Sequence, residues 1–329
     1  MITKVRDRLV PEAQRRTLEE LSADLDLREG DRTSRYSAFW IMLILSAVIA
    51  ACGVIGDSTA TVIGAMIIAP LSTPIMGTAL GLVKRSRSGA ALFVLGGASA
   101  VVGIGLLASV VVPNSYELLS NSQISGRTSP GLVDLVAAMA TGLAGAVALA
   151  RRDVGAVMPG VAIAISLVPP LVVVGVCLGN GAPLLAFGAL VLFLSNMLAL
   201  VLAGMFVFAA LGYITPPSAE VSRRRAAWAL GGLGVIVVGA LVLSTVANYL
   251  TSSWESRVRQ EASAWLADTP GAAVTGVDLH ATTFTIGVRA PGDLPPVATL
   301  LARLRSVVPD SFPIIVQTTQ GSVVVVRGQ

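Results

Sequence analysis

Two apolar stretches of the sequence place prolines beside hydroxyl side chains. In "IAPLSTPIM", Pro70 and Pro74 flank the pair Ser72-Thr73, and in "AISLVPPLV" a serine precedes two adjacent prolines. Because proline has no N–H, a proline inside a helix leaves the carbonyl four residues earlier without its helical donor. The second stretch contributes Ser166, Pro169 and Pro170. The carbonyls predicted to lose their donors are those of Met66, Pro70, Ile165 and Ser166.

Such breaks allow more than one kind of chemistry. Freed carbonyls can coordinate a cation, and the N-terminus of a half-helix that begins after Ser72-Thr73 can attract an anion. Unpaired backbone groups in lipid cost several kcal/mol, so they persist only against protein or water. The sequence therefore predicts a polar pathway at the two breaks. The alternative is a packing kink, in which the hydroxyl groups of Ser72, Thr73 or Ser166 satisfy the freed carbonyls.

Three further polar residues lie in or beside apolar runs. Asn196, in "LFLSNMLAL", is predicted either to bond between helices or to line the pathway. Asp57 and Asp153 each stand where an apolar run begins, and aspartate there is a preferred helix N-cap; a polar site is the alternative. With a single histidine, His280, and no nucleotide-binding fingerprint, we expect no enzyme, no cofactor and no metal site.

The composition indicates the class of protein that must hold these residues. The chain has 329 residues, of which 54% are hydrophobic and 13% are charged, whereas soluble domains carry about 25% charged residues. We therefore predict an α-helical polytopic membrane protein in contact with the lipid bilayer. The net charge of +4 is small and falls in the connections, which indicates topology signals and not nucleic-acid binding.

Seven apolar runs are long enough, or nearly so, to cross a hydrocarbon core of ~30 Å. They are Tyr36–Ile55, Thr59–Val83, Gly89–Val112, Leu132–Ala150, Val154–Leu178, Leu184–Leu211 and Ala227–Leu250. Arginine or lysine residues precede the first run and follow the second, fourth and sixth runs. This alternation is the positive-inside pattern, so we expect an inner-membrane protein with a cytoplasmic N-terminus and an extracytoplasmic C-terminus. It also favours one broken crossing, and not a hairpin, for the second run.

The two proline-containing runs resemble each other at a constant offset of 96 residues. The identical pairs are Asp57/Asp153, Ala60/Ala156, Gly64/Gly160, Ile67/Ile163, Leu71/Leu167, Pro74/Pro170 and Leu82/Leu178. Each repeat contains three spans, which is an odd number. Two consecutive copies must therefore run in opposite directions across the membrane. The sequence thus predicts a 3+3 inverted repeat, an architecture common among secondary transporters. Two similar kinked helices without a common origin are the alternative.

The predicted organisation has six parts. A cytoplasmic polar leader, with a short helix in it, is followed by two membrane repeats separated by an outer loop, by a seventh membrane helix and by an extracytoplasmic domain. The order helix-strand-strand-helix-strand-strand predicts that this domain is a small α+β fold. The boundaries are 1–35, 36–112, 113–131, 132–211, 227–250 and 251–329.

The stretches "VIGAMIIAPLSTPIMGTALGL" and "GVAIAISLVPPLVVVGVCLG" resemble the bacterial membrane-protein family catalogued as domain of unknown function 389. The resemblance covers roughly residues 36–210. It implies the class of protein and no particular activity. In that family an apolar residue often replaces Ser72-Thr73, so a polar role there would be particular to this chain.

From these features we expect a transporter or channel for an unidentified small solute or ion. The alternative is a membrane-anchored sensor or assembly scaffold that acts through its C-terminal domain. Glycine-rich helix faces make a homo-oligomer the expected state.

Overall fold

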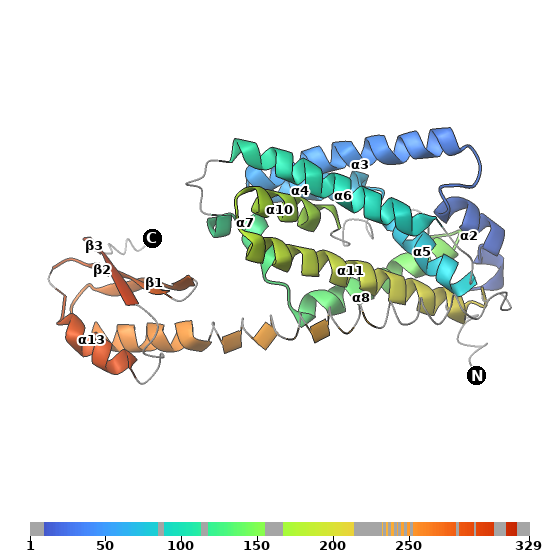
Figure 1. Ribbon diagram of the computed structural model, residues 1–329. Coiled ribbons are helices and arrows are strands. Elements are labelled where there is room, and N and C mark those ends of the chain that lie inside the picture. The colour runs from blue at the N-terminus through green and yellow to red at the C-terminus, as the bar shows by residue number, and fades with distance from the viewer. Residues whose placement is uncertain are drawn as a thin grey trace, which may run out of the picture. The chain divides into compact units, whose positions relative to one another are not determined.

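The structure is a computed structural model that describes most of the chain. The described residues are 10–84, 89–112, 118–154, 167–213, scattered positions between 232 and 250, 253–280, 283–292, 294–305 and 314–320. The chain divides into two compact units, Met1–Ser244 and Thr245–Gln329, which we describe separately (Figure 1).

In the first unit, four of the described helices are long and apolar enough to cross a membrane. They are α3 (Arg32–Ile55), α6 (Ala90–Ala108, extended by a 3-10 turn to Val111), α8 (Leu132–Ala150) and α11 (Pro183–Ala210). Each matches a predicted run to within a few residues. The start of α3 lies upstream of the predicted Tyr36 because Asp31 caps the helix, accepting hydrogen bonds from the N–H groups of Thr33 and Ser34.

The second predicted span is a helix, a break and a second helix. The two helices are α4 (Thr59–Ile68) and α5 (Ser72–Lys84), and the chain bends by 48° between their axes. At 1.5 Å per residue the halves are about 15 Å and about 20 Å long, so the bent pair reaches about 32 Å end to end. That length is sufficient for a hydrocarbon core of ~30 Å, and the pair counts as a fifth candidate span.

The path of this pair runs from one end of α3 to the other, as the predicted broken crossing requires. Helix α4 begins just beyond Gly56, at the far end of α3. At the end of α5, Lys84 Nζ donates to Ser22 Oγ at 2.6 Å in helix α2 (Leu18–Leu25), and Arg35 near the start of α3 donates to the carbonyl of Asp24 in the same helix at 2.8 Å. Lys84 therefore lies at the end where α3 begins, whereas a hairpin would return it to the end of Gly56.

The fifth and seventh predicted spans are described only in part. Helix α10 (Val168–Gly179) occupies the second half of the predicted fifth span, and residues 155–166 lie outside the described residues. Most of the predicted seventh span, 227–250, also lies outside them, and the positions of it that are described are all helical. The span count of seven therefore stays a prediction.

Glycines let the helices of the bundle approach closely. A Cβ added to Gly105 in α6 would overlap the carbonyl oxygen of Val172 in α10, and one added to Gly175 would overlap that of Val102. A Cβ added to Gly204 in α11 would lie 2.9 Å from the methyl carbon of Ala79 in α5. Helix α11 also packs on α8, and one continuous apolar core joins these helices.

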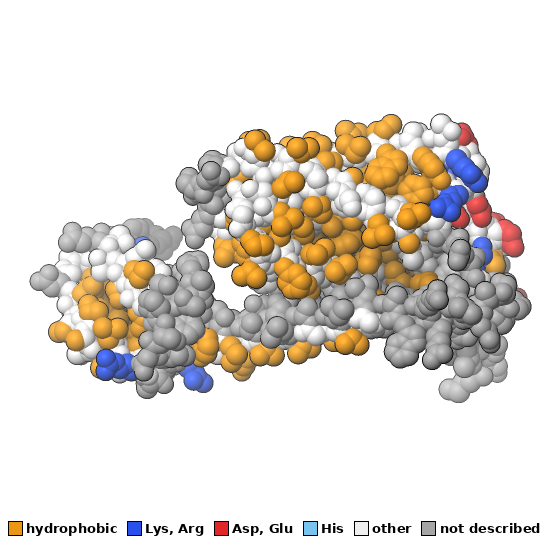
Figure 2. Space-filling view, viewed as in Figure 1, with side chains coloured by type: hydrophobic (Ala, Val, Ile, Leu, Met, Phe, Trp, Pro, Cys, Tyr) orange, Lys and Arg blue, Asp and Glu red, His pale blue; other side chains and the backbone are white. Residues whose placement is uncertain are grey.

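The polar leader folds onto one end of this bundle. We call residues 10–31 the N-terminal strap. Its helix, α2, begins with a reciprocal capping box between Thr17 and Glu20, and it buries Leu21 and Leu25 in the main apolar core. The predicted short helix of the leader is thus present, and it is partly buried. On the face of the bundle seen in Figure 2, the charged side chains gather at this end.

The connection 113–131, predicted as a loop, contains a short helix. Helix α7 (Ser122–Thr128) follows a single 3-10 turn, Leu118–Ser120, and Asn121 caps it by accepting from the N–H groups of Gln123 and Ile124. The sequence did not predict it, because seven mostly polar residues show no apolar periodicity.

The second unit has a small sheet and its own core. Residues 253–265 are helical and are followed by β1 (Ala273–His280), β2 (Thr283–Ala290), α13 (Val297–Leu304) and β3 (Ile314–Gln320). The sheet order is β1-β2-β3, with β1 antiparallel and β3 parallel to β2. Side chains from both helices and the sheet, Trp265, Phe284 and Leu300 among them, share one apolar cluster. The predicted fourth strand lies in 321–329, outside the described residues.

Candidate functional site

The break between α4 and α5 lies about halfway along the path of this pair. Thr73 precedes Lys84 by eleven residues, or about 16 Å of helix, and α4 occupies a similar length on the other side. The first predicted site residues are therefore brought to one depth. Pro74 is buried, and Met66, Pro70, Ser72 and Thr73 are half-buried.

Hydrogen bonding at the break differs from the prediction at one carbonyl. The Pro70 carbonyl, predicted to lack a donor, accepts the N–H of Thr73 at 3.3 Å. Within the described parts of the chain, no hydrogen bond reaches the Met66 carbonyl or the hydroxyl groups of Ser72 and Thr73. At the residue before Met66, the buried Ser46 Oγ of α3 donates to the carbonyl of Ala65 at 2.8 Å. This bond connects α4 to α3.

The prolines mark where the second half-helices begin. Pro74 is the third residue of α5, and Pro169 and Pro170 follow the first residue of α10. The N–H groups of a first helical turn have no intrahelical acceptor, so proline is tolerated there. Pro74, Pro169 and Pro170 therefore lie in the first turns of α5 and α10 and not in the interior of either helix.

Only the residues that follow the predicted second break are described. Pro169 and Pro170 are buried, and Ile165 and Ser166 lie outside the described residues. Their predicted role as freed carbonyls stays a prediction. Asn196 is buried in the middle of α11, next to Ser195, whose Oγ donates to the carbonyl of Leu192 within the same helix at 2.8 Å.

At the end of the bundle that carries Gly56, Asp57 does not cap α4. Ser58 takes that position and accepts the N–H of Thr61. Asp57 adopts a left-handed conformation, with φ 48°, and accepts hydrogen bonds from Ser122 Oγ at 2.6 Å and from the N–H of Gln123 at 3.2 Å. The bond from Ser122 is the main cause that lowers the pKa of the Asp57 carboxyl group.

Helix α7 fastens this turn to the bundle with two more side chains. Asn121 Nδ2 donates to the carbonyl of Val54 at 2.7 Å, and Gln123 Nε2 donates to Thr59 Oγ1 at 2.8 Å. Sequence reasoning missed these residues. An asparagine before a short polar segment is a cap signal, but its partners lie more than sixty residues away.

At the opposite end, Asp153 accepts two hydrogen bonds from Arg151, at 2.9 and 2.6 Å. This pairing lowers the pKa of the Asp153 carboxyl group and raises the pKa of the Arg151 guanidinium. Whether Asp153 also caps a helix depends on residues after 154, outside the described range.

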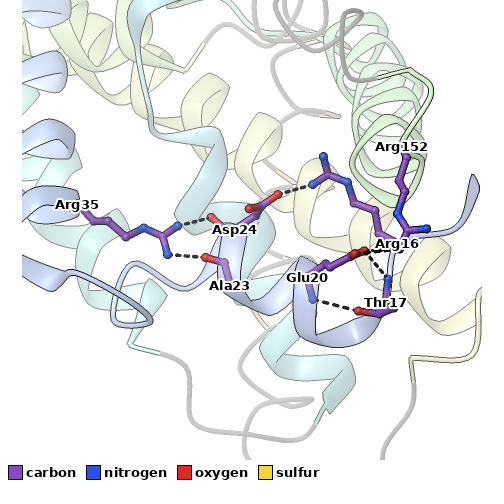
Figure 3. A network of polar contacts seen from close by, with 7 residues as sticks. All are labelled: Arg16, Thr17, Glu20, Ala23, Asp24, Arg35 and Arg152. Atoms are coloured by element: carbon purple, nitrogen blue, oxygen red, sulfur yellow. Dashed lines mark hydrogen bonds and ion pairs between the residues drawn. The ribbon is translucent and has the colours of Figure 1, made fainter.

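The N-terminal strap makes a polar network at this same end (Figure 3). Glu20 accepts from Arg152 at 2.8 and 2.9 Å, while Arg16 pairs with Asp24 and Arg35 donates to the carbonyl groups of Ala23 and Asp24. The backbone bond from Thr17, and then the bond from Arg152, lower the pKa of the Glu20 carboxyl group.

No group of three His, Cys, Asp or Glu side chains in the described ranges is placed to hold a metal ion. The break itself offers backbone carbonyls, hydroxyl groups and a helix N-terminus. These groups can bind or pass a small polar species without covalent chemistry.

The long apolar helices and the bent pair are those of a helical membrane protein. Residues 66–202 match the family described as domain of unknown function 389, which confirms the resemblance seen in the sequence. An uncharacterized protein of Methanocaldococcus jannaschii is 33% identical over 180 residues, covering 52% of this chain and 53% of the relative. The chain thus spans about half the length of this curated relative. No solved structure matches. Neither description names an activity.

Proposed function

We propose that the protein passes a small solute or ion across a membrane at its broken helices. The observation that carries this proposal is the break between α4 and α5 halfway along a crossing. There, the hydroxyl groups of Ser72 and Thr73 have no hydrogen-bond partner among the described residues. Polar groups at the middle of a bilayer are costly unless water, protein or a ligand satisfies them.

The inverted repeat belongs to the same proposal, and helix packing supports it. At the offset of 96 residues, Met76 and Ala79 of α5 correspond to Val172 and Gly175 of α10. The first pair contacts α11, the third helix of the second repeat, at Gly204. The second pair contacts α6, the third helix of the first repeat. Equivalent positions therefore meet equivalent helices of the opposite repeat, as a two-fold relation between repeats requires.

The orientation follows from the charges. The strap contacts the ends of α5 and α8 and the start of α3, and Tyr213 after α11 donates to the carbonyl of Arg16 at 2.6 Å. All of these termini adjoin basic connections and lie at one end of the bundle. By the positive-inside rule we propose that this end is cytoplasmic and, with an odd number of spans, that the C-terminal unit lies outside an inner membrane.

A scaffold or sensor is the second candidate. The separate core of the C-terminal unit favours it, because a domain that folds around its own core can bind partners independently of the helices. In that case the bundle would be dry at the break.

Flux measurements distinguish the two candidates. We expect purified protein in vesicles to move at least one member of a panel of inorganic ions and small metabolites. Thr73→Val, which removes the hydroxyl group at the break, should lower that flux about tenfold, the effect of losing roughly 1.4 kcal/mol of stabilisation.

Thr78→Val is the matched control. Thr78 lies in the same helix, and its hydroxyl group donates to the carbonyl of Pro74 at 2.9 Å, within its own helix. We expect this control to keep its flux. A panel in which nothing moves would contradict the transport proposal, and equal losses in both variants would contradict the role of the break.

A further inference from the structure

We propose that the N-terminal strap is a latch that closes the cytoplasmic end of the pathway and must release before the break opens to that side. This inference rests on the proposed function, because a latch needs a route to close. It concerns access to the break and not the identity of the solute.

The first reason is that the strap joins both repeats. From the first repeat it holds the end of α5, through Ser22 and Lys84. From the second repeat it holds the end of α8, where the N–H of Arg16 donates to the carbonyl of Ala150 at 3.0 Å and the N–H of Arg152 donates to the carbonyl of Gln14 at 2.9 Å. In an inverted-repeat transporter the two repeats move against each other. A segment bonded to both repeats at one end opposes that motion.

The second reason is that the strap lies close against the broken helix itself. A Cβ added to Gly77, in the second turn of α5, would lie 2.6 Å from the carbonyl oxygen of Leu25. A cavity of about 30 Å³ remains between α2 and α5, lined in part by Gly77, Lys84 and Asp26. That volume is enough for only a few water molecules. The strap therefore covers the face of α5 that carries Gly77 and Lys84, between the end of this helix and the break.

The third reason is that the contacts are of a kind that can separate. The Arg152–Glu20 pair is about half exposed on each side, and Arg16–Asp24 is partly exposed. Such pairs contribute little stability individually, so they do not lock the strap permanently. Its buried apolar anchors are only four, Leu21 and Leu25 on the two turns of α2 and Val10 and Leu27 on either side of it. The helix can leave as one small unit without unfolding the long spans.

The test uses Gly77→Val as a wedge that displaces the strap from α5 without changing the strap. Gly64→Val is the matched control, because Gly64 lies in α4 and a Cβ there meets nothing within 4 Å. In both backgrounds Cys52 and Cys177 are replaced by alanine, and a single cysteine is introduced as Thr73→Cys. The readout is the rate at which a membrane-impermeant maleimide, added to inside-out vesicles, labels that cysteine.

We expect the wedge to raise the labelling rate about tenfold and the control to leave it unchanged, since a shift of about 1.4 kcal/mol in a closed–open equilibrium has that effect. Release of the strap is verified separately. A short bis-maleimide should join Glu20→Cys to Arg152→Cys efficiently in the control and poorly in the wedge variant.

A second pair of variants keeps the test valid if the wedge disturbs folding. Glu20→Arg sets two like charges against each other at Arg152 and should also raise labelling, whereas the swap Glu20→Arg with Arg152→Glu should restore the low rate. Glu12→Arg is its control, a charge reversal at an exposed strap residue.

If the strap releases and labelling does not change, the latch proposal is wrong, whatever the flux measurements give. If labelling rises while no probe of the ion and metabolite panel moves, the latch stands as a gate to the break and the transport proposal fails.

Discussion

Gly105→Val should lower the free energy of unfolding by about 3 kcal/mol or more, because overpacking a closely fitted core forces backbone shifts. Gly105 is buried in α6, and its backbone lies against the carbonyl of Val172 in α10. A valine side chain has no space there, so α6 and α10 must separate. Since α10 also packs on α3 and α11, the loss should extend through the bundle.

Gly103→Val is the control for this prediction. Gly103 lies two residues earlier in α6, and a Cβ there meets nothing within 4 Å. We expect the free energy of unfolding of Gly103→Val to stay within about 1 kcal/mol of the wild-type value, which is the scale of helix propensity. Thermal unfolding in a mild detergent measures both. Similar losses in the two variants would contradict the α6–α10 packing.

Asn121→Ala should be the next most damaging substitution, with a loss of about 2 kcal/mol from a lost helix cap and a lost buried hydrogen bond. Asn121 is almost fully buried, caps α7 through two N–H groups and donates to the carbonyl of Val54. Without it, α7 loses its attachment to the turn between α3 and α4. Amide hydrogens of α7 and of this turn should then exchange faster with solvent.

Asn180→Ala is the comparison for that variant. Asn180 Nδ2 donates to the carbonyl of Val176 at 2.9 Å, a local bond at the end of α10, and its side chain is half-buried. We expect a loss of under about 1 kcal/mol, the net value of one ordinary hydrogen bond. If the two variants unfold at the same temperature, Asn121 does not hold the turn as described.

Much of the bundle could be predicted from the sequence because apolar runs end at polar residues. Helix α8 covers Leu132–Ala150 as predicted, since glycine precedes the run and Arg151 ends it. The break in the second run was predicted from Pro70 and Pro74. The position of Pro74 in the first turn of a new helix was not predicted, because a proline in a first turn and a proline in a helix interior look alike in sequence.

The contacts at the two ends of the bundle could not be predicted. The capping box of Thr17 and Glu20 is visible in "TLEE", but the sequence does not say that Glu20 meets Arg152. The same holds for Asn121 and Val54, which are 67 residues apart. Polar side chains have no periodic signal that reveals their partners, so such contacts emerge only when the helices are packed.

Transport at the break requires that α4 and α5 form one crossing whose break lies at mid-depth. Labelling of single cysteines, Thr59→Cys at one end and Lys84→Cys at the other, tests this directly. A membrane-impermeant thiol reagent should label Thr59→Cys in intact cells and Lys84→Cys only in inside-out vesicles. Labelling of both positions from the same side would mean that the segment is a hairpin. Labelling of Lys84→Cys in intact cells would reverse the orientation, and either result would contradict the account.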